Sequence, residues 1–221
     1  MKFRYLTFDC YGTLVDWRRG ITESLEAAGV ATRLGPGRLL EAYVAAEKEQ
    51  ERDYQRYRDV LKKSVTALSR EVGIKIGRKT VDEFASSVPA WPAFPDSRRF
   101  LKRMGEAGYV RYILSNVDTD ILEETIRKSR LEVDGYVTAE EVRSYKPERR
   151  HWLRFIEETG AERKEVLHVA QSVFHDILPT QGLGIASAWV NRYREAIPAG
   201  AHPLYIVDSL RSLAGILEEE A

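Results

Sequence analysis

This chain of 221 residues lacks several features that would assign it to a specialised class of protein. Cys10 is its only cysteine, so an internal disulfide is excluded and a reducing compartment such as the cytoplasm is the simplest expectation. Lys and Arg number 34, as do Asp and Glu, so charge favours neither nucleic acid nor an anionic membrane as a partner. No signal peptide is evident, and no apolar run approaches membrane-spanning length. Hydrophobic residues make up 43% of the chain, enough to fill a core.

Short β-type runs alternate with helical patterns through most of the chain. This alternation is typical of an α/β protein with a doubly wound parallel sheet. The predicted strands are Phe3–Phe8, Tyr109–Leu114, Val166–Ala170, Ser187–Val190 and Leu204–Val207. The predicted helices are Ser97–Ala107, Thr119–Ser129, Glu148–Thr159, Ile177–Leu183 and one after Asp208.

The stretch from about Trp17 to Val88 lacks any convincing strand. Its apolar residues between Leu40 and Val72 recur at spacings of three and four, which predicts a helical face. We therefore expect a helical cap at 17–92, inserted into a core formed by 1–16 and 93–221. An ordinary helical lobe with no role over a site is the alternative. Tyr and Val residues on the cap helices could also pair two chains in a homodimer.

Asp9 lies at the end of the first predicted strand, just before a turn that contains Gly12. In open α/β sheets, the carboxyl ends of the strands are where sites are built. A buried carboxylate held by backbone N–H groups can attack an electrophile and form an ester. The alternative is an aspartate that caps a helix or stabilises a turn.

Polar residues also stand where several predicted strands end or predicted helices begin. A doubly wound sheet would bring these segments together at one crevice. The segments are Asp9 with Thr13, Ser115-Asn116, Lys146-Pro147, and Gln171-Ser172 with Asp176.

These segments resemble, in order and spacing, the four motifs of the haloacid dehalogenase superfamily. The motifs read Phe8–Asp16, Ile113–Asn116, Tyr145–Pro147 and Gln171–Asp176, and the helical insertion after the first one also fits. Phosphatases of the superfamily carry a second aspartate two positions after the nucleophile, where this chain has Tyr11. The first motif therefore resembles the type II 2-haloacid dehalogenase branch.

The resemblance implies that Asp9 attacks a carbon atom of a small-molecule substrate and that water then hydrolyses the aspartyl ester. A halide needs no proton to leave, whereas a phosphatase needs an acid to protonate its alkoxide. The dehalogenase branch works without metal, so we expect no cofactor. One alternative is a magnesium-dependent small-molecule phosphatase. Another is a catalytically weak binding protein on the same fold.

The resemblance also implies roles for the other polar residues. Lys146 would keep Asp9 ionised, because an adjacent cation lowers the pKa of a carboxyl group, and Asp176 would position Lys146 and the hydrolytic water. Separately, Ser115-Asn116 could be a helix cap, Lys146 a surface lysine, and Asp176 a first-turn acid that complements the helix dipole. The residues expected around the substrate are Thr13, Tyr11, Ser115, Asn116, Gln171, Ser172, Glu47 and Trp152, the last standing where the family has a tyrosine.

The predicted cap departs from the family in its charges. The dehalogenases place an arginine over the substrate carboxylate, but the comparable stretch here, Ala45–Lys48, has none. Glu47 and Glu51 instead share a predicted helix face with Val44. If that face looks into the site, it favours a substrate with an ammonium group beside its carboxylate. Related enzymes that open small strained cyclic amino acids resemble the first motif. The alternative is that both glutamates are solvated or paired with nearby cations.

Overall fold

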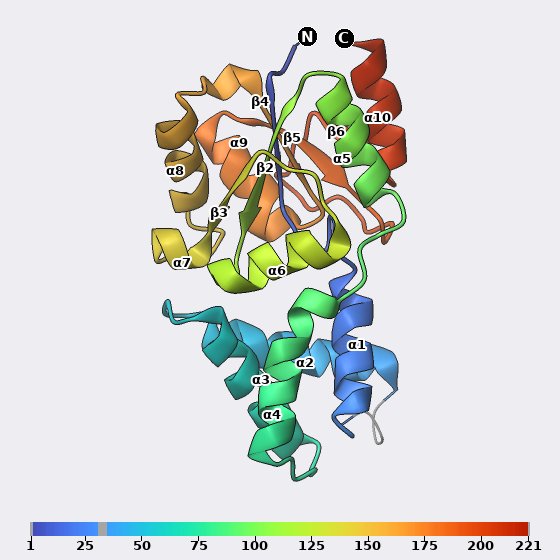
Figure 1. Ribbon diagram of the computed structural model, residues 1–221, viewed down its shortest axis with the longest axis vertical. Coiled ribbons are helices and arrows are strands. Elements are labelled where there is room, and N and C mark those ends of the chain that lie inside the picture. Colours follow the sequence, from blue (N-terminus) through green and yellow to red (C-terminus); the bar gives the residue numbers. More distant parts are fainter. Residues whose placement is uncertain (1, 31–34, 221) are drawn as a thin grey trace.

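Six parallel strands form the sheet in the computed structural model, which describes residues 2–30 and 35–220 (Figure 1). They run in the order β3-β2-β1-β4-β5-β6. Chain order reverses between β1 and β4, which creates the crevice where sites of such sheets form. The doubly wound parallel sheet predicted from the sequence is confirmed. The strands are β1 (Tyr5–Phe8), β2 (Val110–Ser115), β3 (Gly135–Thr138), β4 (Val166–Ala170), β5 (Ala186–Val190) and β6 (Tyr205–Val207).

Strand β3 was not predicted from the sequence. It has four residues, begins at a glycine and forms one edge of the sheet, so its local signal is weak. It is specified by its pairing with β2, in which Ile113 lies opposite Tyr136 and Ser115 opposite Thr138.

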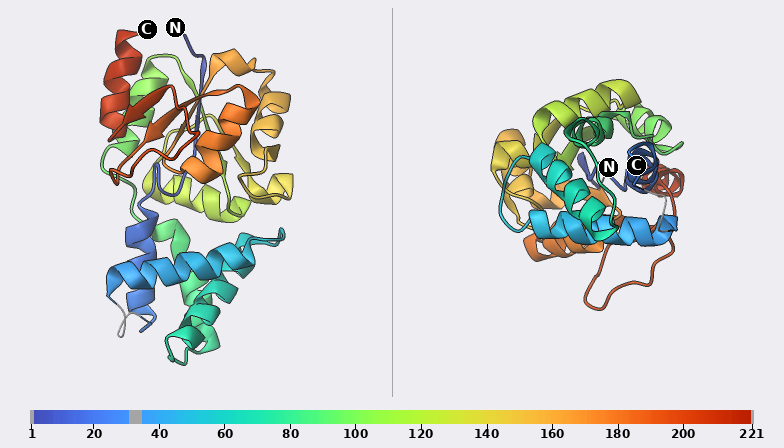
Figure 2. Two further views of the ribbon diagram at one scale, coloured as in Figure 1. Left: turned by 180° about the vertical axis from the view of Figure 1, so that it is seen from behind. Right: turned by 90° about the horizontal axis from the view of Figure 1, so that it is seen from below.

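Helices cover both faces of the sheet (Figures 1 and 2). On β1, Phe8 packs edge-on against Phe100 with ring centroids 5.9 Å apart, and Tyr5 packs against Phe155 at 5.6 Å on the other face. One face is covered by α5 (Ser97–Glu106), α6 (Thr119–Ser129) and α10 (Leu210–Glu219), and the other by α8 (Arg150–Thr159) and α9 (Leu178–Leu183). Short segments complete the core: α7 (Ala139–Val142), η2 (Arg163–Glu165) and the π-turn η3 (Val173–Ile177).

A helical lobe lies beyond the carboxyl ends of the strands (Figures 1 and 2). It consists of α1 (Trp17–Ala27), α2 (Pro36–Gln50), α3 (Tyr57–Glu71), α4 (Arg78–Ser87) and the short η1 (Val88–Ala90). Its described residues contain no strand, as predicted. The periodic face predicted between Leu40 and Val72 is divided between α2 and α3, which pack on each other.

The two connections between the lobe and the sheet run side by side. The backbone N–H of Phe94 donates to the carbonyl of Leu14 at 2.9 Å, and the N–H of Asp16 donates to the carbonyl of Pro92 at 2.8 Å. This short pairing anchors both ends of the lobe beside the turn that follows β1.

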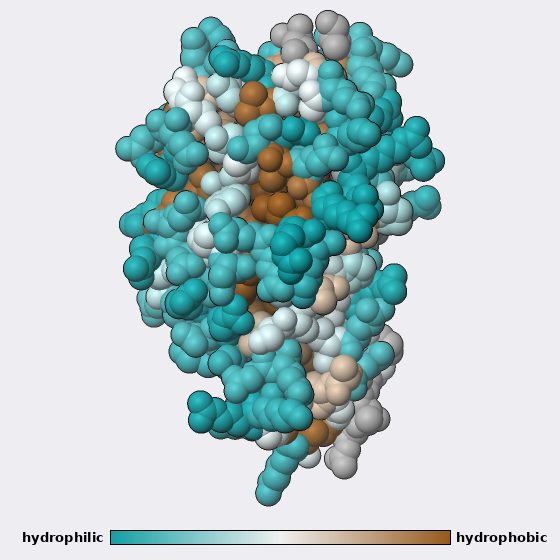
Figure 3. Space-filling model, in the orientation of Figure 1, coloured by the Kyte–Doolittle hydropathy of each residue, from teal (hydrophilic) through white to brown (hydrophobic). Residues whose placement is uncertain are grey.

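The exterior is mostly polar. The face in Figure 3 is largely hydrophilic, and its apolar residues lie in recesses between the elements. No helix within residues 2–30 and 35–220 is long and apolar enough to cross a membrane.

Candidate active site

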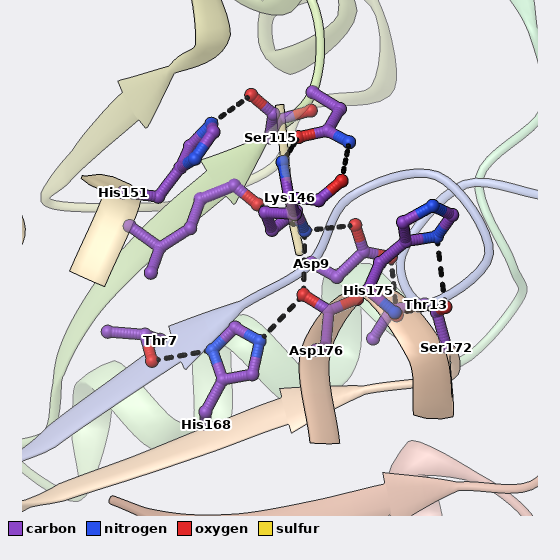
Figure 4. Close-up of polar contacts among 12 residues, drawn as sticks. Thr7, Asp9, Thr13, Ser115, Lys146, His151, His168, Ser172, His175 and Asp176 are labelled. Atoms are coloured by element: carbon purple, nitrogen blue, oxygen red, sulfur yellow. Dashed lines mark hydrogen bonds and ion pairs between the residues drawn. The ribbon is translucent and has the colours of Figure 1, made fainter. Parts of the chain in front are cut away.

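Asp9 is the first residue after β1, and its backbone turns toward the lobe directly afterwards. The turn requires Gly12, whose φ of +114° is strained for any residue with a side chain. A Cβ at Gly12 would also stand 3.1 Å from the Trp17 indole nitrogen. The turn leaves Asp9 only 9% exposed, at the crevice between β1 and β4 (Figure 4).

The Lys146 ammonium is fully engaged at this crevice. It donates to Asp9 Oδ1 at 2.9 Å, to Asp176 Oδ1 at 2.7 Å and to the carbonyl of Leu114 at 3.0 Å (Figure 4). An ammonium has three donors, so these acceptors fix it in place. Lys146 is 2% exposed, which excludes the alternative of a surface lysine.

The Asp176 oxygen that contacts Lys146 also contacts a buried histidine. His168 Nε2 lies 3.0 Å from Asp176 Oδ1, and His168 Nδ1 lies 2.9 Å from Thr7 Oγ1 (Figure 4). Burial lowers the pKa of His168. Because a carboxylate can only accept, His168 Nε2 donates to Asp176, and in the neutral ring Nδ1 accepts from the Thr7 hydroxyl. Hydrogen bonds thus join five buried side chains into one continuous network, made up of Thr7, His168, Asp176, Lys146 and Asp9.

Thr13 and Asn116 orient the charged groups. The Thr13 hydroxyl accepts from the N–H of Gln171 at 3.0 Å, so its own proton is directed to Asp9 Oδ2 at 2.9 Å. The Asn116 side chain donates to the carbonyl of Lys146 at 3.1 Å and accepts from the N–H of Lys146 at 2.7 Å. Asn116 therefore holds the lysine backbone.

Burial and pairing shift the ionisation of these groups in different directions. Burial raises the pKa of Asp9, an effect that the Lys146 charge opposes and the Asp176 charge reinforces. The sequence led us to expect that Lys146 would dominate, but burial outweighs it. For Asp176, the Lys146 ammonium and His168 overcome burial and hold the pKa below 3.8. Asp176 and Asp9 in turn raise the pKa of Lys146 against the opposing effect of burial, so it stays protonated.

A cavity of about 240 Å³ lies between this hydrogen-bonded network and the lobe. Ser115 Oγ and Asp176 Oδ2 are buried atoms that form no hydrogen bond with any described residue. Both are therefore available to a ligand. The predicted site residues that line the cavity are Asp9, Tyr11, Glu47, Ser115, Asn116, Lys146, Gln171, Ser172 and Asp176.

Two residues predicted to contact substrate do not line the cavity. Thr13 lies behind Asp9 and acts on it through the hydrogen bond described above. The prediction that Trp152 contacts substrate is wrong. Its side chain is fully buried in the apolar layer beneath α8, with its ring centroid 5.2 Å from that of His168. The helix begins at Arg150, two residues later than predicted, and its apolar face turns Trp152 into the core.

Sequence reasoning missed several residues of the site. Trp17, Tyr57 and Trp91, which line the cavity from the lobe, were not predicted. His175 was considered as a lining residue because it adjoins Asp176, and it does line the cavity, from η3. Trp17 and Trp91 stand next to the two connections of the lobe, a position that could have indicated their role. The contacts of His168 with Thr7 and Asp176 were not predicted, because a strand pattern shows that a side chain is buried but not which polar group it meets.

The donor set does not suit a magnesium ion. Asp9 and Asp176 share the Lys146 ammonium, and Gln171 stands where an acid would be needed. Within residues 2–30 and 35–220, no three His, Cys, Asp or Glu side chains are grouped in a way that could hold a metal ion.

Comparison with known proteins gives consistent matches along the chain. The family model for the haloacid dehalogenase-like hydrolases matches residues 3–179. The chain is 24% identical over 198 residues to the (S)-2-haloacid dehalogenase 4A of Burkholderia cepacia, covering 86% of this chain and 84% of that enzyme. It is 21% identical over 203 residues to the haloacetate dehalogenase H-2 of Moraxella sp. (strain B), covering 87% of each.

A solved structure shares the whole fold. The L-2-haloacid dehalogenase of Xanthobacter autotrophicus, with chloropropionic acid covalently bound, superimposes with a TM-score of 0.86 at 19% identity. The match covers 99% of this chain and 100% of that one. At this identity the likeness shows the fold alone.

Proposed function

Because this chain belongs to the haloacid dehalogenase-like hydrolases, we propose that it hydrolyses a bond at a substrate carbon through an ester of Asp9. The substrate class to test first is the 2-haloacids, which are small carboxylic acids with a halogen beside the carboxylate. Ser115 and Asn116 line the cavity where the substrate carboxylate would bind, and Asp9 lies at its base.

In the first step, one carboxylate oxygen of Asp9 displaces the halide from C2. The new carbon–oxygen bond forms as the carbon–halogen bond breaks, and the halide leaves with the electron pair. No proton is transferred in this step, which agrees with Tyr11 in place of an acid two residues after Asp9. Thr13 and Lys146 hold the carboxylate in position for attack.

In the second step, water attacks the ester carbonyl carbon of Asp9. Asp176 Oδ2 accepts a hydrogen bond from that water and positions it, and the Lys146 ammonium stabilises the oxyanion that forms. The alcohol oxygen leaves with a proton, and a second proton passes to solvent. Asp9 returns as a carboxylate that keeps one oxygen of the water.

One observation carries this proposal above the others. It is the buried carboxylate of Asp9, paired with Lys146 at the base of the cavity, with Tyr11 rather than an acid two residues after it. The relatives support it, since the curated proteins from Burkholderia cepacia and Moraxella are both dehalogenases. The enzyme from Xanthobacter autotrophicus was captured with chloropropionic acid covalently bound.

Halide release from (S)- and (R)-2-chloropropanoate tests the proposal. We expect release by the wild-type protein and a loss of about 1,000-fold or more in Asp9→Asn, because an amide is a poor nucleophile. Asp59→Asn, an exposed acid in the first turn of α3, is the matched control and should keep full activity. Turnover of phosphate esters that a chelator stops would favour the phosphatase instead. Turnover of neither substrate class would favour a binding protein.

We propose no cofactor, since the departing halide needs neither a proton nor a metal ion. We also propose that 1–16 with 93–221 form the catalytic domain and that 17–92 form a cap. The single cysteine supports a cytoplasmic location, and a homodimer formed through the cap helices stays a prediction.

A further inference from the structure

The lobe presents two acids to the cavity that the proposed reaction does not use. Glu47, near the end of α2, and Glu51, which follows that helix, line the same cavity as Asp9 and Lys146. Val44, one turn earlier, lines it as well. This face of α2 therefore looks toward the nucleophile.

The protein itself does not neutralise these two acids. Glu47 accepts hydrogen bonds only from phenols among the described residues, from Tyr57 at 2.8 Å and Tyr43 at 3.2 Å. No cationic side chain of residues 2–30 and 35–220 forms an ion pair with Glu47 or Glu51. The nearest candidates in sequence make other contacts: Arg52 pairs with Glu49 at 2.7 Å, and the Lys48 ammonium lies 5.9 Å from the Phe174 ring centroid.

The charges around the cavity are therefore unbalanced. Four carboxyl groups (Asp9, Glu47, Glu51 and Asp176) face a single ammonium, that of Lys146, and the ammonium is already shared by two of them. Among the described residues, the only other basic side chain in the cavity wall is His175, whose pKa burial holds below 6.5. Burial raises the pKa of both glutamates, and the positive charge of a bound ammonium would favour their ionised form, whereas a purely anionic ligand would oppose it.

Aromatic rings complete the wall around the two glutamates. Trp17, Tyr57 and Trp91 line the cavity together with Glu47 and Glu51. Aromatic faces attract cations, and carboxylates beside them are the usual counterpart of an ammonium ligand. From the sheet side, the free hydroxyl of Ser115 and the amide of Asn116 can hold a carboxylate.

We propose that the natural substrate carries an ammonium group in addition to its carboxylate, and that Glu47 and Glu51 bind this ammonium. The inference rests on the proposed function, because it places the carboxylate and the reacting carbon at the Asp9 end of the cavity. The substrate class is a small zwitterionic acid with a leaving group at carbon. The cavity, about 240 Å³, suits a small molecule.

Calorimetric binding of two unreactive acids tests the proposal. 4-Aminobutanoate and pentanoate have the same number of heavy atoms, and they differ in carrying an ammonium or a methyl group at one end. We expect the ammonium compound to bind about tenfold more tightly to the wild-type protein. Glu47→Gln and Glu51→Gln should each reduce that preference severalfold, and the double variant should abolish it. Gln keeps the shape and can still accept the tyrosine hydrogen bonds of Glu47.

Glu49→Gln is the matched control. Glu49 lies on the same helix, its side chain is 55% exposed, and it does not line the cavity. It should keep the wild-type preference. Equal affinity for the two acids, tighter binding of pentanoate, or no binding of either by about 10 mM would overturn the proposal. Neither acid can react, so such a result leaves ester formation at Asp9 as a separate question.

Discussion

Lys146 is the residue on which the charge balance of the site depends. It separates two buried carboxylates that would otherwise repel each other, and all three of its protons are used. Its neighbours oppose burial and keep it charged, whereas burial prevails at Asp9 and raises the pKa of that carboxyl. The ionised fraction of Asp9 therefore determines how the proposed activity falls at low pH.

We expect Lys146→Gln to slow ester formation about 100-fold at neutral pH, because the attacking carboxylate loses its positioning donor. Activity needs ionised Asp9, so it falls as the pH drops through the Asp9 pKa. Removing the ammonium raises that pKa further, and the acid limb of the profile should move to higher pH. Single-turnover halide release measured against pH would show both effects.

Lys128→Gln, an exposed lysine on α6 that pairs with Glu124, is the control and should leave the profile unchanged. If Lys146→Gln kept its acid limb in the wild-type position, the electrostatic role assigned to Lys146 would be wrong.

The sequence predicted the residues of the reacting centre better than those around it. Asp9 and Asp176 come after strands and Lys146 comes before a helix, each within a recognisable motif, and the fold brings the three side chains together. The positions of Trp152 and His168 could not be predicted, because both depend on how α8 packs against β4. The sequence placed Glu51 only on a predicted helix face. Its pKa of about 8 arises from burial and from the adjacent Glu47, and the sequence does not show that burial.

At the scale of elements, one core residue connects the sheet to the lobe. Asp118 occupies the N-cap position of α6, but its side chain caps a different helix: it accepts from the N–H groups of Tyr57 and Arg58 at 2.9 and 3.0 Å. These are the first residues of α3, whose own N-cap position, Arg56, provides no side-chain acceptor. The start of a lobe helix is thus fixed by a carboxylate from the core.

Asp118→Ala should lower the free energy of unfolding by about 2 kcal/mol, since it leaves two helix N–H groups without their acceptor. Asp120→Ala is the comparison, because Asp120 is two residues away and pairs with Arg58 at 2.8 Å, but its side chain is 56% exposed. Its effect should stay within about 0.5 kcal/mol. Denaturant unfolding measures both, and equal losses would show that the capping contact contributes little.

Element prediction failed where tertiary contacts override local pattern. The short edge strand β3 is stabilised by pairing with β2, which no local run of residues encodes. The helical periodicity from Leu40 to Val72 was real, but the chain breaks between Gln50 and Tyr57 so that α2 and α3 can pack together. That break places Glu51 at the cavity.

At the scale of the whole molecule, the proposed function assigns the reacting groups to the sheet and selectivity to the lobe. Both connections of the lobe are fastened beside the turn after β1, so Trp17 and Trp91 reach the cavity from the two ends of one insertion. The nucleophile is thus enclosed between a fixed core and an acidic, aromatic cover. The proposed reaction depends on a covalent bond that forms at Asp9 within this cavity.

Hydrolysis in heavy-oxygen water under single-turnover conditions, followed by mass analysis, tests that bond most directly. Trypsin releases Asp9 in the peptide from Tyr5 to Arg18, which also contains Asp16 as an internal reference. We predict heavy oxygen in the Asp9 carboxylate and none in Asp16, because water attacks the ester carbonyl. Heavy oxygen in the product alone, with an unlabelled Asp9 after turnover, would contradict the account.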